Sequence, residues 1–97
     1  RRIFVFCHSS NKASQEILEL LKQEEVGDFI NPRFVRVQVA KKDSKSLKEK
    51  FNFKKFPTLF ILNRDGSLLQ ELRDIHSPEE MLAAIREVLE KQNNKRK

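Results

Sequence analysis

Two stretches of the chain are almost wholly apolar, and they limit the folds that it can adopt. Residues 3–7 read Ile-Phe-Val-Phe-Cys, and residues 58–62 read Thr-Leu-Phe-Ile-Leu. A short strand without a polar face is typical of a central position in a sheet that is buried on both sides. We therefore expect helices on both faces of a sheet in which these two strands occupy the interior.

The residues between the two apolar stretches predict two helices and a strand. Apolar residues recur at helical spacing over residues 11–25, after the N-capping run Ser9-Ser10-Asn11, and Gly27 is the expected helix terminator. Residues 34–40 alternate Val with Arg36 and Gln38, which indicates a strand with one wetter face and favours an edge position. A shorter helix follows, capped by Asp43 or Ser44.

The last third of the chain predicts a hairpin and a helix. The Asp65-Gly66 turn joins the 58–62 strand to an antiparallel strand over residues 67–72, and Ser77-Pro78-Glu79-Glu80 begins a helix with a capping box. The resulting order is β-α-β-α-β-β-α, an α/β domain with a four-stranded mixed sheet over residues 1–92. Residues 93–97 form a basic tail that we expect to be flexible.

The block Phe56-Pro57-Thr58-Leu59-Phe60-Ile61, followed by the Asp65-Gly66 turn, resembles the second half of a thioredoxin-fold domain. In that family a short loop leads from a helix to an apolar-Pro-Thr motif and then to a hairpin. The resemblance covers essentially the whole chain and implies that Pro57 follows a cis peptide bond. It also implies that the extra N-terminal strand and helix of longer thioredoxins are absent, which leaves the strand over residues 34–40 at an edge.

The redox motif of that family, Cys-x-x-Cys at the start of the first helix, has no counterpart here. Aligning Phe6 with the phenylalanine that ends the corresponding strand places Asn11-Lys12-Ala13-Ser14 in that position. The family needs its thiol there because a helix N-terminus lowers the thiol pKa. Neither Asn11 nor Ser14 can form or resolve a mixed disulfide.

The single cysteine, Cys7, has two interpretations. A free cysteine at the end of an apolar strand is usually a small buried core residue. Alternatively, Cys7 is the nucleophile of a monothiol oxidoreductase, which requires an exposed thiol with a lowered pKa. The adjacent His8 does not favour the second interpretation, because neighbouring strand residues point to opposite faces.

The remaining polar residues suggest no metal or cofactor. His8 and His76 lack companions at ligand spacing, and the serines near the first helix are expected to be caps rather than nucleophiles. With only Gly27 and Gly66, the chain has no glycine-rich phosphate loop.

The chain carries 20 Lys and Arg against 14 Asp and Glu, a formal net charge of +6. The charge fits either a solvated lysine-rich surface or binding to anionic lipid or nucleic acid, although no nucleic-acid motif occurs. The single cysteine favours a reducing, cytoplasmic compartment, and no stretch is long and apolar enough to span a membrane. The chain begins with Arg1 rather than Met, so we expect a domain excised from a larger protein, monomeric in isolation.

The resemblance implies a redox-inactive protein-interaction module of the adaptor or chaperone type. In the family, the first-helix N-terminus and the cis-proline loop form a groove for extended peptides. The residues expected to bind a peptide or protein partner here are Ser10, Asn11, Lys12, Ser14, Phe56 and Pro57.

A narrower resemblance concerns residues 26–35, which contain Phe29-Ile30-Asn31 before a strand. This passage is similar to one in the UAS thioredoxin-like domains of ubiquitin-pathway adaptors. That resemblance implies binding of fatty acid as a further alternative.

Overall fold

The structure is a computed structural model that describes residues 1–95, with side chains described through Lys91. Its sheet has the order β2-β1-β3-β4. In chain order the elements are β1 (Arg2–His8), α1 (Lys12–Lys22), α2 (Glu24–Ile30), β2 (Phe34–Ala40), a 3₁₀ turn (Lys41–Asp43), α3 (Lys45–Phe51), β3 (Thr58–Leu62), β4 (Leu68–Leu72) and α4 (Pro78–Lys95).

The two apolar strands β1 and β3 occupy the two interior positions of the sheet. β1 pairs in parallel with β2 and antiparallel with β3, and β3 pairs antiparallel with β4. The prediction of a four-stranded mixed sheet is therefore confirmed, with residues 34–40 at an edge. At this edge Val35 and Val37 on one face and Arg36 and Gln38 on the other are all exposed, because the helices cover the centre of the sheet more fully than its β2 edge.

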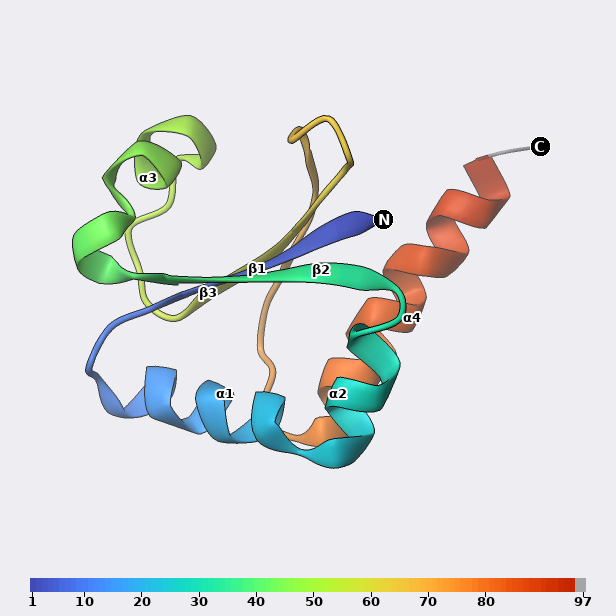
Figure 1. Cartoon of the computed structure of the whole chain (residues 1–97), viewed down its shortest axis with the longest axis horizontal. Coiled ribbons are helices and arrows are strands. Elements are labelled where there is room, and N and C mark those ends of the chain that lie inside the picture. Colours follow the sequence, from blue (N-terminus) through green and yellow to red (C-terminus); the bar gives the residue numbers. More distant parts are fainter. Residues whose placement is uncertain (96–97) are drawn as a thin grey trace.

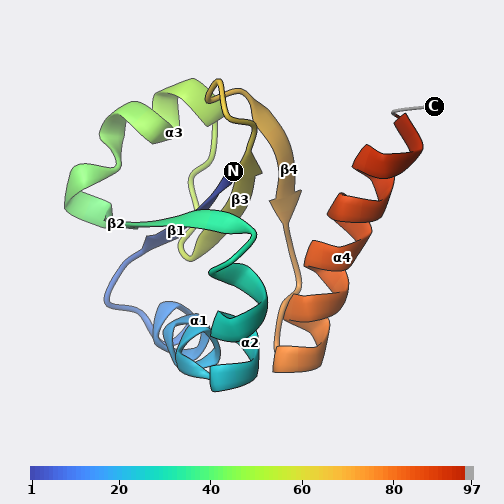
Figure 2. The same cartoon turned by 45° about the vertical axis from the view of Figure 1, so that its right-hand side comes forward.

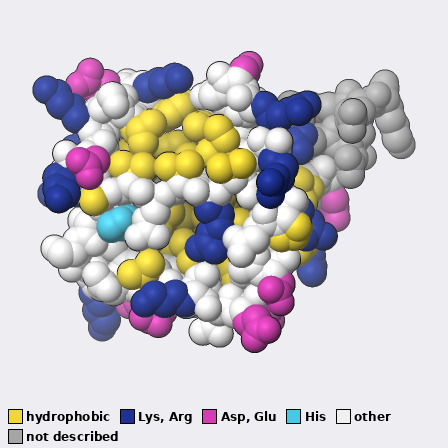
Figure 3. Space-filling model, viewed as in Figure 1, with side chains coloured by type: hydrophobic (Ala, Val, Ile, Leu, Met, Phe, Trp, Pro, Cys, Tyr) yellow, Lys and Arg dark blue, Asp and Glu magenta, His cyan; other side chains and the backbone are white. Residues whose placement is uncertain are grey.

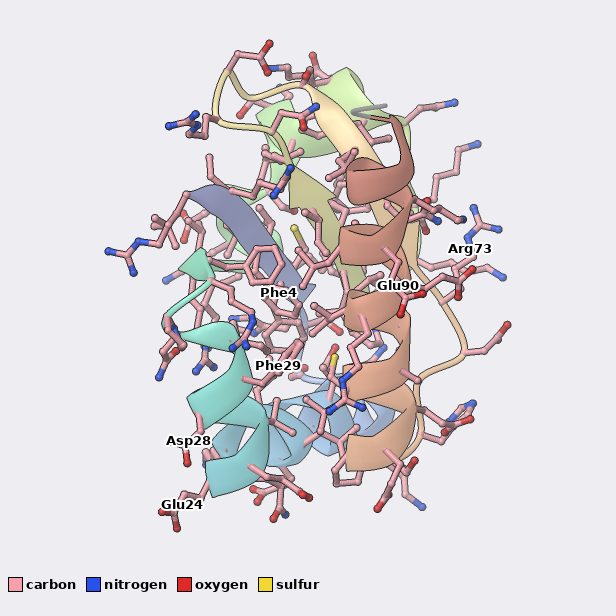
Figure 4. The ribbon with its side chains drawn as sticks, turned by 90° about the vertical axis from the view of Figure 1, so that its right-hand side faces the viewer. Phe4, Glu24, Asp28, Phe29, Arg73 and Glu90 are labelled. Atoms are coloured by element: carbon pink, nitrogen blue, oxygen red, sulfur yellow. The ribbon has the colours of Figure 1, made fainter. Side chains whose placement is uncertain are left out.

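Helices cover both faces of the sheet, as the sequence predicts (Figures 1 and 2). Helices α1, α2 and α4 lie on one face, and the larger core cluster fills the space between them and the sheet. Phe4, labelled in Figure 4, belongs to this cluster. Its ring meets that of Phe34 edge-on, with 6.2 Å between centroids. The opposite face carries α3, over a smaller cluster that includes Val5, Cys7 and Phe60.

The prediction of one helix over residues 11–25 is wrong, and so is the role assigned to Gly27. The chain leaves α1 at Gln23, whose backbone is extended, and α2 begins at once with Gly27 inside it. The buried residues explain the break: Ile17 and Leu21 are four apart, but the next one, Val26, follows after five. A straight helix would turn Val26 away from the core, whereas the break at Gln23 turns it back.

The ends of the other elements follow their capping residues. Ser77 accepts a hydrogen bond from the Glu80 backbone N–H at 3.1 Å, and α4 begins at Pro78. Helix α4 continues to Lys95, past the domain boundary expected at residue 92, while residues 96–97 lie outside the described part of the chain. At the β3–β4 turn, Gly66 adopts a positive φ of 90°. Within residues 1–95, none of the helices has the length and apolar character needed to cross a membrane.

Candidate functional site

The start of α1 and the loop before β3 are joined by one side chain, Asn11. Its Oδ1 accepts a hydrogen bond from the Ser14 backbone N–H at 2.8 Å, so Asn11 caps the helix. Its Nδ2 donates to the Phe56 carbonyl oxygen, also at 2.8 Å. The Phe56–Pro57 peptide bond is cis, the isomer that the thioredoxin resemblance implies. Asn11 thus links the two segments that the sequence analysis assigned to one site.

The other expected binding residues differ in how they can meet a partner. Ser10 and Lys12 are exposed beside Asn11 at the helix start. Ser14 is only 1% exposed, and its Oγ accepts a hydrogen bond from the Ser9 backbone N–H at 3.0 Å. Ser14 therefore stabilises the turn into α1 from inside, which corrects its assignment as a partner-binding residue.

Phe56 points to the side of the loop that carries α3. Its ring meets that of Phe53 at 5.9 Å between centroids and packs against the smaller core cluster. The ammonium groups of Lys41 and Lys48 lie 5.9 and 5.6 Å from the centre of the Phe56 ring. Phe56 thus forms a half-buried aromatic surface beside two lysines, on the α3 side of the sheet.

A groove of about 940 Å³ opens on the α1 side of the cis-proline loop. Pro57 is the one expected site residue that lines it, and Ile17, Leu20, Leu59 and Ile75 supply apolar surface. Charged residues of both signs lie along its walls: Glu16, Glu19, Glu71 and Asp74 against Lys54, Lys55 and Arg73.

Sequence reasoning missed one wall of this groove, the segment between β4 and α4. Arg73, Asp74, Ile75 and His76 all line it, and Asp74 adopts a positive φ of 57°. No motif in the sequence marks this segment as part of a site. Only the folding of the sheet brings it beside α1 and Pro57.

Cys7 lies in the sheet below α3 rather than in the groove. Its side chain is fully buried, and burial raises the pKa of its thiol from 9.0 to about 11. A buried, protonated thiol is a poor nucleophile. His8 points to the opposite face, where its Nε2 lies 3.3 Å from the Gln38 amide nitrogen and its ring lies near Phe6.

The described residues hold no group of three or more His, Cys, Asp or Glu side chains that could bind a metal ion. His76 lies at the rim of the groove, where its backbone N–H donates to a Glu80 carboxylate oxygen at 2.9 Å. The lining of the groove offers charged groups of both signs and apolar surface.

The sheet order, the cis-proline loop and the helix that begins beside it define an α/β domain of the thioredoxin fold. The family model described as Thioredoxin-like domain matches residues 4–89, and the chain belongs to that family.

Solved structures agree on the fold. The chain is similar to a thioredoxin from Thermus thermophilus, with 21% identity, a TM-score of 0.71, and coverage of 92% of this chain and 74% of that one. It is also similar to a protein from Bacteroides thetaiotaomicron that carries a disulphide-isomerase designation, with 23% identity, a TM-score of 0.74, and coverage of 93% and 78%.

Human ERp44 in its zinc-bound form matches at 20% identity with a TM-score of 0.71, and the match covers 89% of this chain but 26% of ERp44. No curated protein sequence matches this chain. At these identities the structural matches establish the fold alone.

Proposed function

We propose that this domain is a redox-inactive interaction module that binds an extended segment of a partner protein in the groove beside Pro57. The observation that carries the proposal is the position of Asn11. Its side chain caps α1 and holds the Phe56 carbonyl. The thioredoxin resemblance implies that this neutral amide occupies the place where a redox member of the family has a thiol. On this proposal the site keeps its helix start and its proline loop but has no reactive group.

The groove suits a peptide chain better than a small ligand. Its lining combines apolar residues with carboxylates on α1 and with the cations of Lys54, Lys55 and Arg73. An extended segment can place apolar side chains on the floor and charged ones against the walls. Ser10 and Lys12 are exposed next to Asn11, and Ala13 of the same helix start lines the groove, so on this proposal they contact the flanking residues of the segment.

The proposal is tested by selecting random peptides on the wild-type domain and mapping the selected peptides by amide chemical shifts. We expect the amide signals to shift at the start of α1, at Thr58 and its neighbours, and at residues 73–76. Arg73→Glu should weaken binding, whereas Arg64→Glu, an equal change of charge in the β3–β4 turn, should not. Selected peptides that shift neither segment, or that respond equally to the two variants, would contradict the proposal.

The main alternative is a monothiol oxidoreductase that uses Cys7. The burial of the thiol and its raised pKa favour the interaction module. An insulin-reduction assay separates the two, because a monothiol enzyme loses its activity in Cys7→Ser while the interaction module has none to lose.

The affiliation with UAS domains also stays a proposal. In the structure, residues 26–30 belong to α2 and Asn31 begins the turn into β2. A third alternative is binding of fatty acid, anionic lipid or nucleic acid through the basic surface. Such binding is electrostatic, so its affinity should fall as the salt concentration is raised. We also propose that the protein which contains this domain is located in the cytoplasm.

A further inference from the structure

We propose that a lysine-rich surface at the start of α3 is a second binding site, which takes an acidic segment of a partner protein. This lysine surface consists of Lys41 and Lys48, which lie at the ring of Phe56, and of Lys42 and Lys45 between them in the chain. It goes beyond the proposed groove, because it lies on the α3 side of the sheet.

The positive charge of the chain is concentrated in this region. Residues 41–55 contain seven lysines, no arginine and two acidic residues, Asp43 and Glu49. They therefore carry +5 of the net charge of +6, and the rest of the chain is close to neutral. On the face seen in Figure 3, Lys side chains stand out over α3 and the turn before it. A local excess of one sign attracts and steers ligands of the opposite sign.

The domain does not neutralise these cations itself. Lys41, Lys42 and Lys45 are exposed, and Lys48 is half-buried. Among the residues whose side chains are described, none of the ion pairs involves the segment 41–55. Lys50 is set apart from the lysine surface, because its Nζ lies beside Gly66 in the β3–β4 turn. The ammonium groups of the lysine surface are therefore available to carboxylates of a partner.

The backbones of Lys41 and Lys48 are held together by one buried residue, Ser44. The Ser44 Oγ donates a hydrogen bond to the Lys41 carbonyl oxygen at 2.7 Å. The Ser44 carbonyl oxygen accepts a hydrogen bond from the Lys48 backbone N–H at 2.9 Å. The ring of Phe56 then draws both ammonium groups to within 5.9 Å of its centre. Such ordering before binding lowers the entropic cost of holding a partner.

The chemistry of the surface favours the carboxylates of Asp and Glu. A lysine ammonium is a compact charge with three donors, and it pairs well with a single carboxylate. Nucleic acid fits less well, since it gains much of its affinity for such surfaces from bases that stack on aromatic rings. The Phe56 ring is half-buried, contacts Phe53 and lies near both ammonium groups, so a base would have to displace the lysines.

A membrane surface also fits less well than an acidic protein segment. Proteins that lie on membranes combine basic residues with apolar side chains that enter the lipid. The large apolar residues that are exposed here are Val35, Val37 and Leu68, and none of them belongs to residues 41–57.

The position of the lysine surface separates it from the groove. Ala40 pairs with His8, so Lys41 lies at the opposite end of the sheet from Arg1 and at the end where α1 begins. Lys54 and Lys55 lie between the two sites in the chain and line the groove. The groove walls also carry four carboxylates, those of Glu16, Glu19, Glu71 and Asp74. These carboxylates disfavour an acidic segment in the groove, so the two sites select different partners.

The test uses the 97-residue chain and two capped octapeptides, one of glutamate and one of glutamine, in about 0.15 M salt, where exposed charges more than about 8 Å apart are largely screened. We expect the glutamate peptide to shift the amide signals of residues 41–48 and of Phe56, while the glutamine peptide shifts none. Its affinity should fall as the salt concentration is raised.

Two double variants with the same change of charge locate the site. Lys41→Glu with Lys48→Glu should weaken the glutamate peptide about tenfold, and the neutral pair Lys41→Gln with Lys48→Gln should give a smaller loss. Lys22→Glu with Lys91→Glu, on α1 and α4, should weaken it by less than about twofold. Phe56→Leu removes the ring that orders the lysines and should weaken the peptide about twofold.

Several results would overturn this proposal. Equal losses in the Lys41/Lys48 and Lys22/Lys91 variants would show that net charge alone attracts the peptide. Shifts confined to residues 73–76 would assign the acidic segment to the groove, which leaves the proposed function untouched. A twelve-nucleotide oligothymidine that binds more tightly than the glutamate peptide and is lost in Phe56→Leu would identify nucleic acid as the ligand. Broadening of residues 41–48 by phosphatidylserine vesicles, without binding of the peptide, would identify a membrane surface.

Discussion

The Asn11 side chain amide donates a hydrogen bond of 2.8 Å to the carbonyl oxygen of Phe56, 45 residues further along the chain. The same side chain caps α1 through the Ser14 backbone N–H. One residue therefore holds the start of a helix and the residue before a cis-proline in a fixed relation. This relation fixes the start of α1 beside the loop that carries Pro57.

Replacing Asn11 should separate its two roles. Asn11→Ala removes both hydrogen bonds and should lower the free energy of unfolding by about 1–2 kcal/mol. Asn11→Asp keeps the capping oxygen but loses the donor to Phe56, so it should cost less stability while still shifting the Thr58 amide signal. Urea unfolding and amide spectra measure the two effects, and equal stability of the Asp and Ala variants would argue that the cap contributes little.

Cys7 should resist alkylation in the folded protein, because its thiol is buried and its pKa is raised to about 11. Iodoacetamide at mildly alkaline pH should label the chain only after urea is added. Rapid labelling of the native domain would contradict the burial of the Cys7 thiol and would favour the monothiol alternative. Mass spectrometry gives the extent of labelling in each case.

The same thiol should make stability depend on pH in the alkaline range. The unfolded thiol loses its proton near pH 9, whereas the folded one keeps it to about 11. Its contribution to stability is therefore complete below pH 9 and is lost as pH rises toward 11. The difference in unfolding free energy between wild type and Cys7→Ala should shrink across that interval, and a constant difference would show that the folded thiol titrates normally.

The two glycines should respond oppositely to alanine. Gly27 lies inside α2, and an added Cβ would meet its nearest atom, Asn31 Nδ2, at an ordinary 3.7 Å. Gly27→Ala should stabilise the domain by about 0.5–1 kcal/mol through helix propensity. Gly66 adopts a φ of 90°, so Gly66→Ala should destabilise by roughly 1 kcal/mol. Thermal unfolding of the pair tests both signs at once.

The loss of stability on truncating an aromatic residue to Ala should increase with the burial of that residue. Phe4→Ala removes a ring packed against Phe34 in the core and should cost about 3–5 kcal/mol. Phe29→Ala should cost less, because Phe29 is half-buried between α2 and α4 (Figure 4). Its loss includes cation–π contacts with Arg33 and Arg86, at 4.2 and 5.4 Å from the ring centre, worth about 1 kcal/mol. A larger loss at Phe29 would reverse this ranking.

Local patterns were sufficient to predict most of the fold. The apolar runs of β1 and β3, the alternation of β2 and the capping signals at Asn11 and Ser77 each depend on residues close together in sequence. Helix α2 escaped prediction because Val26, Gly27 and the residues up to Ile30 are weak helix formers, so the local sequence indicates a helix end at Gly27. Burial of Val26 and Ile30 in the core holds this segment helical and sets its direction after the break at Gln23.

In the candidate site, too, some features follow from the local sequence and others depend on the tertiary structure. By itself, the sequence determined that the chain has one cysteine, that Asn11 and Ser77 are capping residues, and that Pro57 directly precedes the apolar run of β3. Only the tertiary structure decided that Ser14 is buried, that Phe56 packs toward α3, and that residues 73–76 form a wall of the groove. These properties depend on which distant segments pack together, and packing across the sheet is set by the whole chain rather than by any local pattern.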